Sequence, residues 1–197
     1  ELTVKVVTKE TLAKENAQKL VRISPDGNYK SALEQQSTEA LHSDPIKFRD
    51  EYIEKNGNIV NPDLARKLSE EYTGINSNEL NNFGSGVKNI VLEHLLDTGK
   101  QRTDSNKTVY WTGGGPGSGK STTLNALDSA DKKQYIAIID TTLAPKSSVK
   151  DISRILNKGY KVEIDYTLAD PFESWKRVVA RTLDDKSPDY NRIVSEE

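Results

Sequence analysis

Apolar residues in the first half of the chain recur at the spacing of amphipathic helices. Polar turns separate them, and these turns carry helix-starting and helix-ending residues, such as Ser43-Asp44-Pro45 before one helix and a glycine after it. The expected helices span residues 9–21, 29–41, 46–55, 61–72 and 86–96, and residues 2–7 resemble a short strand. We therefore expect residues 1–100 to form a helical N-terminal region.

The pattern changes after the polar stretch at residues 97–107. Short apolar runs typical of strands then alternate with helical segments, which indicates βαβ units and a parallel sheet. The expected strands are 108–112, 135–139 and 160–168, and the expected helices are 121–127, 148–156 and 171–183. We predict an α/β fold, with a second unit at residues 107–197 whose parallel sheet is flanked by helices.

Composition narrows the classes of function. Of the 197 residues, 34% are hydrophobic and 29% are charged, with a net charge of −2, so no global basic field favours nucleic acid as a partner. The sequence has no cysteine, which excludes a disulfide framework, a cysteine zinc site and a thiol nucleophile. No apolar run approaches the roughly 18 residues of a membrane span, so we expect no membrane partner.

A glycine-rich stretch between an expected strand and an expected helix is the strongest motif. It reads G-G-P-G-S-G-K-S and satisfies G-x-x-x-x-G-K-[ST], the phosphate-binding P-loop pattern. Glycines let backbone N–H groups surround phosphates, the lysine reaches the β- and γ-phosphates, and the serine hydroxyl ligates Mg²⁺. The expected nucleotide-binding residues are Gly114, Gly115, Pro116, Gly117, Ser118, Gly119, Lys120, Ser121 and Thr122, with Ser121 as the metal ligand.

The alternative interpretation is a purely structural glycine turn, but such turns rarely carry Lys-Ser directly after the last glycine. The motif in this context predicts a P-loop NTPase-like fold that binds ATP and Mg²⁺. The sequence has no N-K-x-D motif, so a GTPase is disfavoured. The short segment after Lys120 suits a small-molecule kinase.

The chain resembles the zeta-toxin family of P-loop kinases over about residues 86–183. The resemblance lies in V-Y-W-T-G-G-G-P-G-S-G-K-S-T, in I-I-D-T-T-L followed by a helix and G-Y-K-V, and in A-D-P-F-E-S-W-K-R-V-V-A-R. It implies ATP- and Mg²⁺-dependent phosphorylation of a nucleotide-sugar hydroxyl, usually of UDP-N-acetylglucosamine, or of a nicotinamide dinucleotide in effector-type members. It also implies an antitoxin or inhibitor protein as partner, and a bacterial cytoplasmic location or delivery into another cell.

One departure from the family concerns the general base. The family places an Asp-x-Asp motif after the strand that follows the P-loop helix, and only Asp140-Thr141-Thr142 is present here. Either Asp140 takes the place of that acidic motif, or the acidic unit is absent. The sequence also lacks methionine altogether. Both features favour the hypothesis that a segment is missing near residues 128–134.

Lys120, Asp140 and Arg181 are the expected catalytic residues. Asp140 follows a buried strand and is either a site carboxylate or a helix cap. Arg177 and Arg181 share a helix face, and we expect Arg181 to bind phosphate and Arg177 to lie on a solvated basic face. We expect Trp111 to pack beneath the sheet and Trp175 to pack its helix against it.

Two rival functions stay open at this point. One is a P-loop kinase with another acceptor, such as a nucleoside, a polynucleotide end or an antibiotic. The other is a nucleotide-binding module without catalysis that acts through its helical half.

Overall fold

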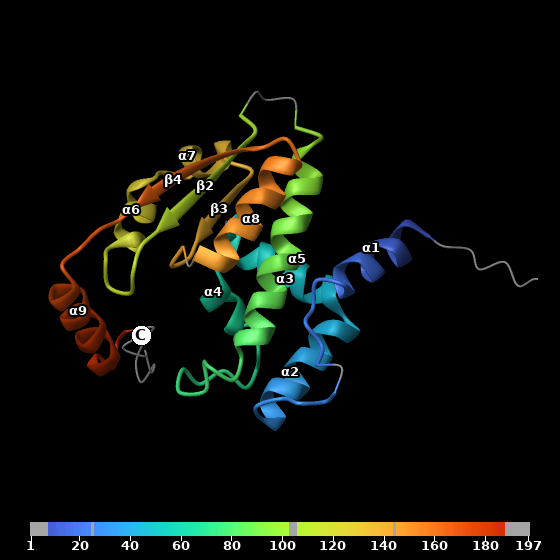
Figure 1. The fold of residues 1–197 in the computed structure, drawn as a ribbon, viewed down its shortest axis with the longest axis horizontal. Coiled ribbons are helices and arrows are strands. Elements are labelled where there is room, and N and C mark those ends of the chain that lie inside the picture. Colours follow the sequence, from blue (N-terminus) through green and yellow to red (C-terminus); the bar gives the residue numbers. More distant parts are fainter. Residues whose placement is uncertain (1–7, 25, 103–105, 144, 188–197) are drawn as a thin grey trace, which may run out of the picture.

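A four-stranded parallel sheet forms the centre of the molecule (Figure 1). The computed structural model describes residues 8–24, 26–102, 106–143 and 145–187, so the strand expected at 2–7 lies outside the described residues. The strand order is β1-β3-β2-β4, where β1 is Ile59–Val60, β2 Thr108–Gly113, β3 Ala137–Asp140 and β4 Lys161–Tyr166. The predicted α/β fold with a P-loop NTPase-like parallel sheet is therefore confirmed.

Nine helices surround the sheet in the described part of the chain. The first five are α1 Lys9–Gln18, α2 Ala32–Ser43, α3 Pro45–Asn56, α4 Pro62–Arg66 and α5 Asn81–Gly99. The others are α6 Lys120–Ala126, α7 Ser129–Gln134, α8 Pro145–Asn157 and α9 Pro171–Leu183. Most lie where the apolar spacing predicts them, but the helix expected at 61–72 ends at Arg66, and β1 and α7 were not predicted.

The helix starts follow from local side-chain hydrogen bonds. The side chains of Thr8 and Asp44 accept bonds from the backbone N–H groups of Thr11 and Lys47, which would otherwise lack partners at the first turns of α1 and α3. At the end of α3, Gly57 adopts a φ of 60°, a conformation that glycine takes without steric cost. These signals explain why the helix boundaries were predictable.

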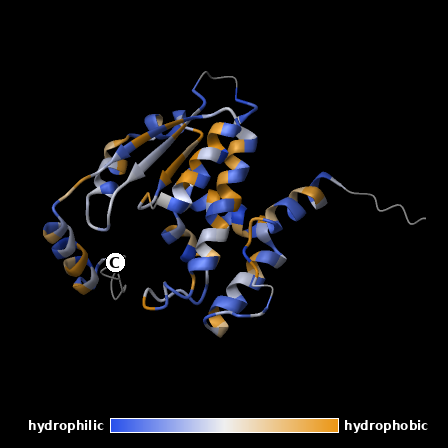
Figure 2. Cartoon of the chain, viewed as in Figure 1, coloured by the Kyte–Doolittle hydropathy of each residue, from blue (hydrophilic) through white to orange (hydrophobic). Residues whose placement is uncertain are grey.

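Helix α5 links the two halves of the chain through one hydrophobic core (Figure 2). Its residues Val87, Val91 and Leu96 are fully buried in the same cluster as Val109 and Trp111 of β2. The sheet also crosses the expected boundary near residue 100, because β1 belongs to the N-terminal half and pairs with β3. The helical region and the P-loop region thus share both a core and a sheet.

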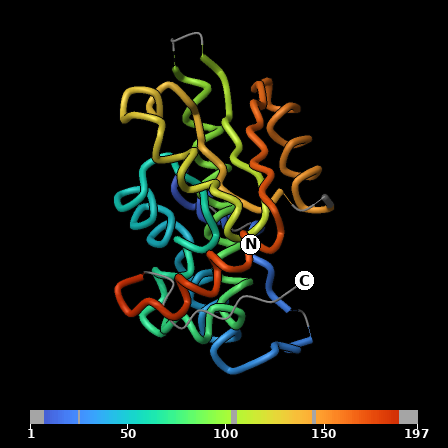
Figure 3. The backbone as a smooth tube through the Cα atoms, turned by 90° about the vertical axis from the view of Figure 1, so that its left-hand side faces the viewer, coloured from blue at the N-terminus to red at the C-terminus, as the bar shows by residue number. Residues whose placement is uncertain are grey.

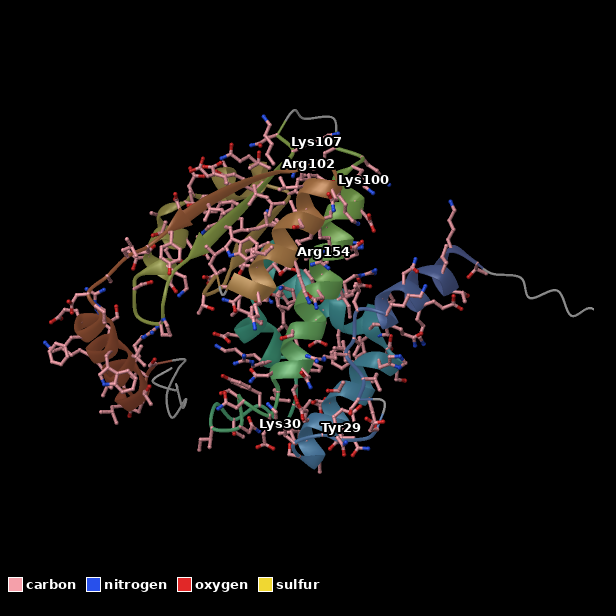
Figure 4. All side chains as sticks on the ribbon, viewed as in Figure 1. Tyr29, Lys30, Lys100, Arg102, Lys107 and Arg154 are labelled. Carbon is pink, nitrogen blue, oxygen red and sulfur yellow. The ribbon has the colours of Figure 1, made fainter. Side chains whose placement is uncertain are left out.

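Ion pairs join α5 to α8 at the edge of this core. Lys88 pairs with Asp151, and the Lys158 ammonium pairs with Glu93 and, at 2.8 Å, with Asp97. Arg154 lies on α8 in the same area (Figure 4). Apolar side chains of α8 pack into the hydrophobic core. The ion pairs therefore surround a contact between α5 and α8 whose centre is apolar.

Helix α9 lies below the sheet, away from α5 and α8 (Figures 1 and 3). Its Val178 is buried, whereas Trp175 is 38% exposed, so the prediction that Trp175 packs the helix against the sheet is wrong. Trp111 is 1% exposed and packs beneath the sheet as expected. One face of α9 instead contributes to the site described below.

The chain runs from α6 through α7 into β3. Helix α7 begins after Asp128, whose side chain accepts a bond from the backbone N–H of Asp131, and it ends at Gln134, with two residues between it and β3. The missing segment expected at 128–134 stays a prediction. Among the described residues, no helix combines the length and the apolar character needed to span a membrane.

Candidate functional site

The glycine-rich stretch forms a loop between the carboxyl end of β2 and the first turn of α6. Gly117 and Gly119 have φ angles of 73° and 107°, in the region that L side chains rarely adopt. A Cβ at Gly117 would also lie 2.2 Å from the Ser174 carbonyl oxygen of α9. Glycine at these positions is therefore required by the backbone course and by the close approach of α9.

Lys120 and Ser118 lie where a phosphate-binding loop needs them. The Lys120 ammonium donates hydrogen bonds to the carbonyl oxygens of Gly114 at 2.7 Å and Gly115 at 2.9 Å, so it lies against the loop. The Ser118 hydroxyl is buried and has no hydrogen-bond partner among the described residues. A buried polar atom of this kind costs free energy unless a further group satisfies it. The loop therefore fits a polyphosphate ligand.

A cavity of about 1080 Å³ opens beside this loop. Its walls come from the loop and α6, the segment containing α4, the end of β3, and α9. Of the expected nucleotide-binding residues, Pro116, Gly117, Gly119, Lys120, Ser121 and Thr122 line it, whereas the buried Gly114 and Ser118 and the exposed Gly115 are not part of the lining. Ser121 and Thr122 are exposed, so their hydroxyls are accessible from the cavity.

Asp140 also lines the cavity, and its carboxylate is held from two sides. The Asn61 side-chain amide donates to its Oδ2 at 2.9 Å, and the Thr112 hydroxyl donates to its Oδ1 at 3.1 Å. The expectation that Asp140 lies at the site is consistent with this position. The alternative of a helix cap has no support in the structure, because β3 is followed by residues 141–143 in irregular conformation rather than by a helix.

Both arginines of α9 line the cavity. Arg177 donates from Nη1 to the Gly117 carbonyl oxygen at 3.3 Å, so it contacts the loop itself. Arg177 is nevertheless exposed, in keeping with the expected solvated face, whereas Glu173, one of its expected partners, pairs with Lys176 instead. Arg181 lies one helical turn further along the same wall, as predicted.

The structure adds one wall that sequence reasoning missed. Asn61, Pro62 and Asp63 follow β1 directly and line the same cavity, with Asn61 beside Asp140 at the end of β3. The Asn61 side-chain oxygen accepts the backbone N–H of Asp63 at 2.7 Å, while its amide holds Asp140. In the sequence, this wall corresponds to Asn-Pro-Asp directly after two apolar residues. That pattern predicted the start of a helix but gave no indication of a site.

Buried Tyr52 fixes the backbone at this wall. Its hydroxyl accepts the Asn61 N–H at 2.9 Å and donates to the Asn61 carbonyl oxygen at 3.2 Å. Burial raises the pKa of Tyr52 from 10.0 to about 12; the Asn61 hydrogen bond lowers the pKa and the Asp140 charge raises it. Tyr52 therefore stays neutral and keeps both hydrogen bonds at any physiological pH.

The charge of the cavity is predominantly positive. Five cationic side chains lie in its walls against two carboxylates, those of Asp63 and Asp140. The cations are Arg66, Lys67, Lys120, Arg177 and Arg181. Such a set favours polyanionic ligands, since guanidinium and ammonium groups bind phosphate oxygens. The volume is also at the upper end of the usual range for small-molecule sites.

Comparison of the chain with protein-family models finds a match to one family. The family model described as Zeta toxin matches residues 125–197, which include β3, α8, β4 and α9 and begin just after the P-loop lysine. A search of curated proteins found no match. The family match confirms the resemblance predicted from the sequence and supports a P-loop kinase-like function.

Proposed function

Because residues 125–197 match the zeta-toxin family, we propose that this chain is an ATP- and Mg²⁺-dependent phosphotransferase that phosphorylates a hydroxyl of a nucleotide sugar or a dinucleotide. UDP-N-acetylglucosamine and a nicotinamide dinucleotide are the candidate acceptors. The observation that carries the proposal is the position of Lys120, Ser121, Arg177 and Arg181 around one cavity beside the P-loop.

The side chains of the cavity have distinct roles in this reaction. Lys120 and the loop N–H groups hold the donor phosphates, and Ser121 supplies an oxygen ligand of the type that Mg²⁺ prefers. Bound Mg²⁺ neutralises charge on the β- and γ-phosphates of ATP. Arg177 and Arg181 face the same space and stabilise the charge on the phosphoryl group during transfer.

The size and charge of the cavity favour an acceptor that itself carries phosphate. Besides Lys120 of the P-loop, the cavity is lined by Lys67 and by Arg66, which is paired with Asp63 at 3.0 Å. Cations from both the loop and the α4 segment are suited to two phosphate-containing substrates. This supports nucleotide sugars and dinucleotides over uncharged nucleosides or antibiotics. An antitoxin that covers the ATP site stays a prediction.

The test is a transfer assay with product identification by mass spectrometry. The full chain is incubated with ATP, Mg²⁺ and each candidate acceptor, next to Lys120→Ala and a control, Lys150→Ala, which changes an exposed lysine outside the cavity. We expect wild type and Lys150→Ala to form the same phosphorylated acceptor. Loss of the phosphate-binding ammonium should reduce the rate in Lys120→Ala by about 10²–10³-fold.

Two outcomes would contradict the proposal. If Mg²⁺·ATP binds in a calorimeter but no acceptor in the panel gains a phosphoryl group, the chain is a nucleotide-binding module or acts on another acceptor. If Lys120→Ala transfers phosphate as fast as wild type, the P-loop is not the donor site.

A further inference from the structure

The cavity has a second carboxylate besides Asp140, and it comes from the half of the chain that precedes the P-loop. We propose that Asp63 is a catalytic residue that accepts the proton of the acceptor hydroxyl. This inference rests on the proposed function and assigns the general base of the same site. It makes the segment of β1 and α4 part of the catalytic machinery rather than of a separate helical region.

Sheet topology brings Asp63 to the site. β1 pairs in parallel with β3, with Ile59 beside Ile138 and Val60 beside Ile139. The residue after β1 is Asn61, which therefore lies beside Asp140, as their 2.9 Å hydrogen bond shows. Ligands of open parallel sheets bind at the carboxyl ends of the strands. Three strand ends, those of β1, β3 and β2, thus meet at one cavity.

The two carboxylates of the cavity differ in what holds them. Both oxygens of Asp140 accept hydrogen bonds from protein side chains, the amide of Asn61 and the hydroxyl of Thr112. Neutral donors from two neighbouring strands thus fix the direction of the Asp140 carboxylate. This position would suit the orientation of a bound Mg²⁺ and its ligands, and we assign that role to Asp140.

Asp63 has a more open environment. Its side chain is 37% exposed, and its Oδ1 accepts from Arg66 Nη1 at 3.0 Å, one turn along α4. The ion pair holds the ionised carboxylate in a fixed direction, since a guanidinium fixes the geometry of the acid that it pairs with. Asp63 lines the same cavity as Lys120 and Ser121, so an acceptor bound in that cavity beside ATP can present its hydroxyl to the Asp63 carboxylate.

The packing of α4 fixes the position of this wall against α3 and α5. Tyr52 holds the Asn61 backbone from one side. On the other side, Gly84 of α5 leaves so little space that an added Cβ would lie 2.7 Å from the Pro62 carbonyl oxygen and 2.8 Å from Arg66 Cγ. A rigid support of this kind is what a catalytic side chain requires.

The proposed step balances as a direct displacement. The acceptor oxygen forms a bond to the γ-phosphorus, and the bond from that phosphorus to the β–γ bridging oxygen breaks. ADP leaves with the electron pair of the broken bond. The hydroxyl proton passes to the Asp63 carboxylate and then to solvent, so the carboxylate is regenerated for the next turnover.

The experiment compares Asp63→Asn with Asp140→Asn and with a control, Asp26→Asn, which changes an exposed aspartate in a distant turn. Asp63→Asn keeps shape and removes the proton acceptor, so we expect kcat to fall by about 10²–10⁴-fold. Calorimetric affinity for Mg²⁺·ATP and the thermal unfolding midpoint should stay at wild-type values. Asp140→Asn should instead raise the Mg²⁺ concentration needed for half-maximal rate.

A pH profile separates catalysis from a structural role. In wild type, the logarithm of kcat/KM should fall with unit slope at acidic pH as the base is protonated, and Asp63→Asn should lose this limb. Asp63→Glu, which restores a carboxylate on a longer stem, should recover part of the rate. If Asp63→Asn fails to fold, Asp63→Ser replaces it in the same measurements.

The outcomes distinguish this inference from the proposed function. If wild type transfers phosphate and Asp63→Asn does so at the same rate with the same acidic limb, the inference is wrong and the proposed function stands. The same holds if Asp140→Asn lowers kcat at saturating Mg²⁺ and removes the acidic limb while Asp63→Asn keeps the wild-type rate. A wild-type chain that phosphorylates no acceptor contradicts both.

Discussion

At the scale of single residues, the P-loop side chains were predictable because their chemistry depends on local sequence. Glycines with positive φ, a lysine and a serine in fixed order specify a phosphate cradle without help from distant residues. The roles of Asp63 and Arg177 depend instead on which elements face one another across the cavity. No spacing in the sequence indicates that residues 63 and 120 line the same cavity, so a pattern in one segment could not reveal that wall.

His94 gives a residue-scale prediction about pH. Burial lowers its pKa from the ordinary value of 6.5; Arg49 acts in the same direction, and Asp50 and Asp97 oppose it. The folded state therefore favours neutral His94, while the unfolded chain binds the proton more readily. The contribution of neutral His94 to the free energy of unfolding is therefore fully present above pH 6.5, and it is lost as the pH falls toward 5.

Two measurements check the His94 prediction. In an NMR titration the His94 imidazole protons should shift with a midpoint below 6.5. The thermal midpoint of wild type should decrease more between pH 7 and pH 5 than that of His94→Gln. A midpoint at or above 6.5, or equal decreases in the two proteins, would show that His94 is not held neutral.

At the scale of elements, the contact between α4 and α5 determines where the acceptor wall lies. Gly84→Ala adds a methyl group where the Pro62 carbonyl oxygen is only 2.7 Å away. Overpacking costs about 1–3 kcal/mol, and the gain in helix propensity of about 1 kcal/mol offsets part of it. We expect a free energy of unfolding lower by about 1 kcal/mol and a slower transfer, with unchanged affinity for Mg²⁺·ATP.

Ser85→Ala is the matched control for this substitution. Ser85 neighbours Gly84 on α5 but is exposed, so alanine gains helix propensity there without new contacts. Denaturant unfolding and transfer kinetics of the two variants provide the comparison. Equal stability and equal transfer rates in both would mean that α4 is not held by close contact with α5.

The sequence predicted long elements well and short ones poorly. Helix α9 was predicted at its observed bounds, because its apolar spacing extends over 13 residues and Pro171 begins it. β1 has only two residues, and its strand conformation comes from pairing with β3 rather than from its own pattern. Helix α4 is also short. It has five residues and ends at Arg66, where the chain enters a series of turns that the apolar spacing did not indicate.

At the scale of the whole molecule, the two halves of the chain depend on one another. Leu80, Leu92 and Leu96 of the N-terminal half are fully buried in the same core as Val109 and Trp111. The change in composition near residue 100 predicted a boundary between two units. Composition shows which residues of a segment are polar, but it does not show which other segment its apolar face packs against. A shared core is the reason that an N-terminal segment can supply a wall of the P-loop site.

This dependence predicts the behaviour of the fragment 107–197. Each buried leucine or valine contributes about 2 kcal/mol, so the loss of the α5 contacts approaches the whole stability of a typical domain, about 5–15 kcal/mol. We expect the fragment to show no cooperative thermal transition and a poorly dispersed amide NMR spectrum, unlike the full chain. A fragment that unfolds cooperatively and binds ATP would show instead that the P-loop region folds alone.

The most direct test of the account is the fate of the γ-phosphate of labelled ATP in the presence of the full chain, Mg²⁺ and one candidate acceptor at a time. We predict that label appears in UDP-N-acetylglucosamine or in a nicotinamide dinucleotide with one equivalent of ADP formed per labelled product, and that little is released as inorganic phosphate. Label that stays in ATP, or that passes to water at the same rate with and without acceptor, would contradict the assignment of this cavity to phosphoryl transfer between two bound substrates.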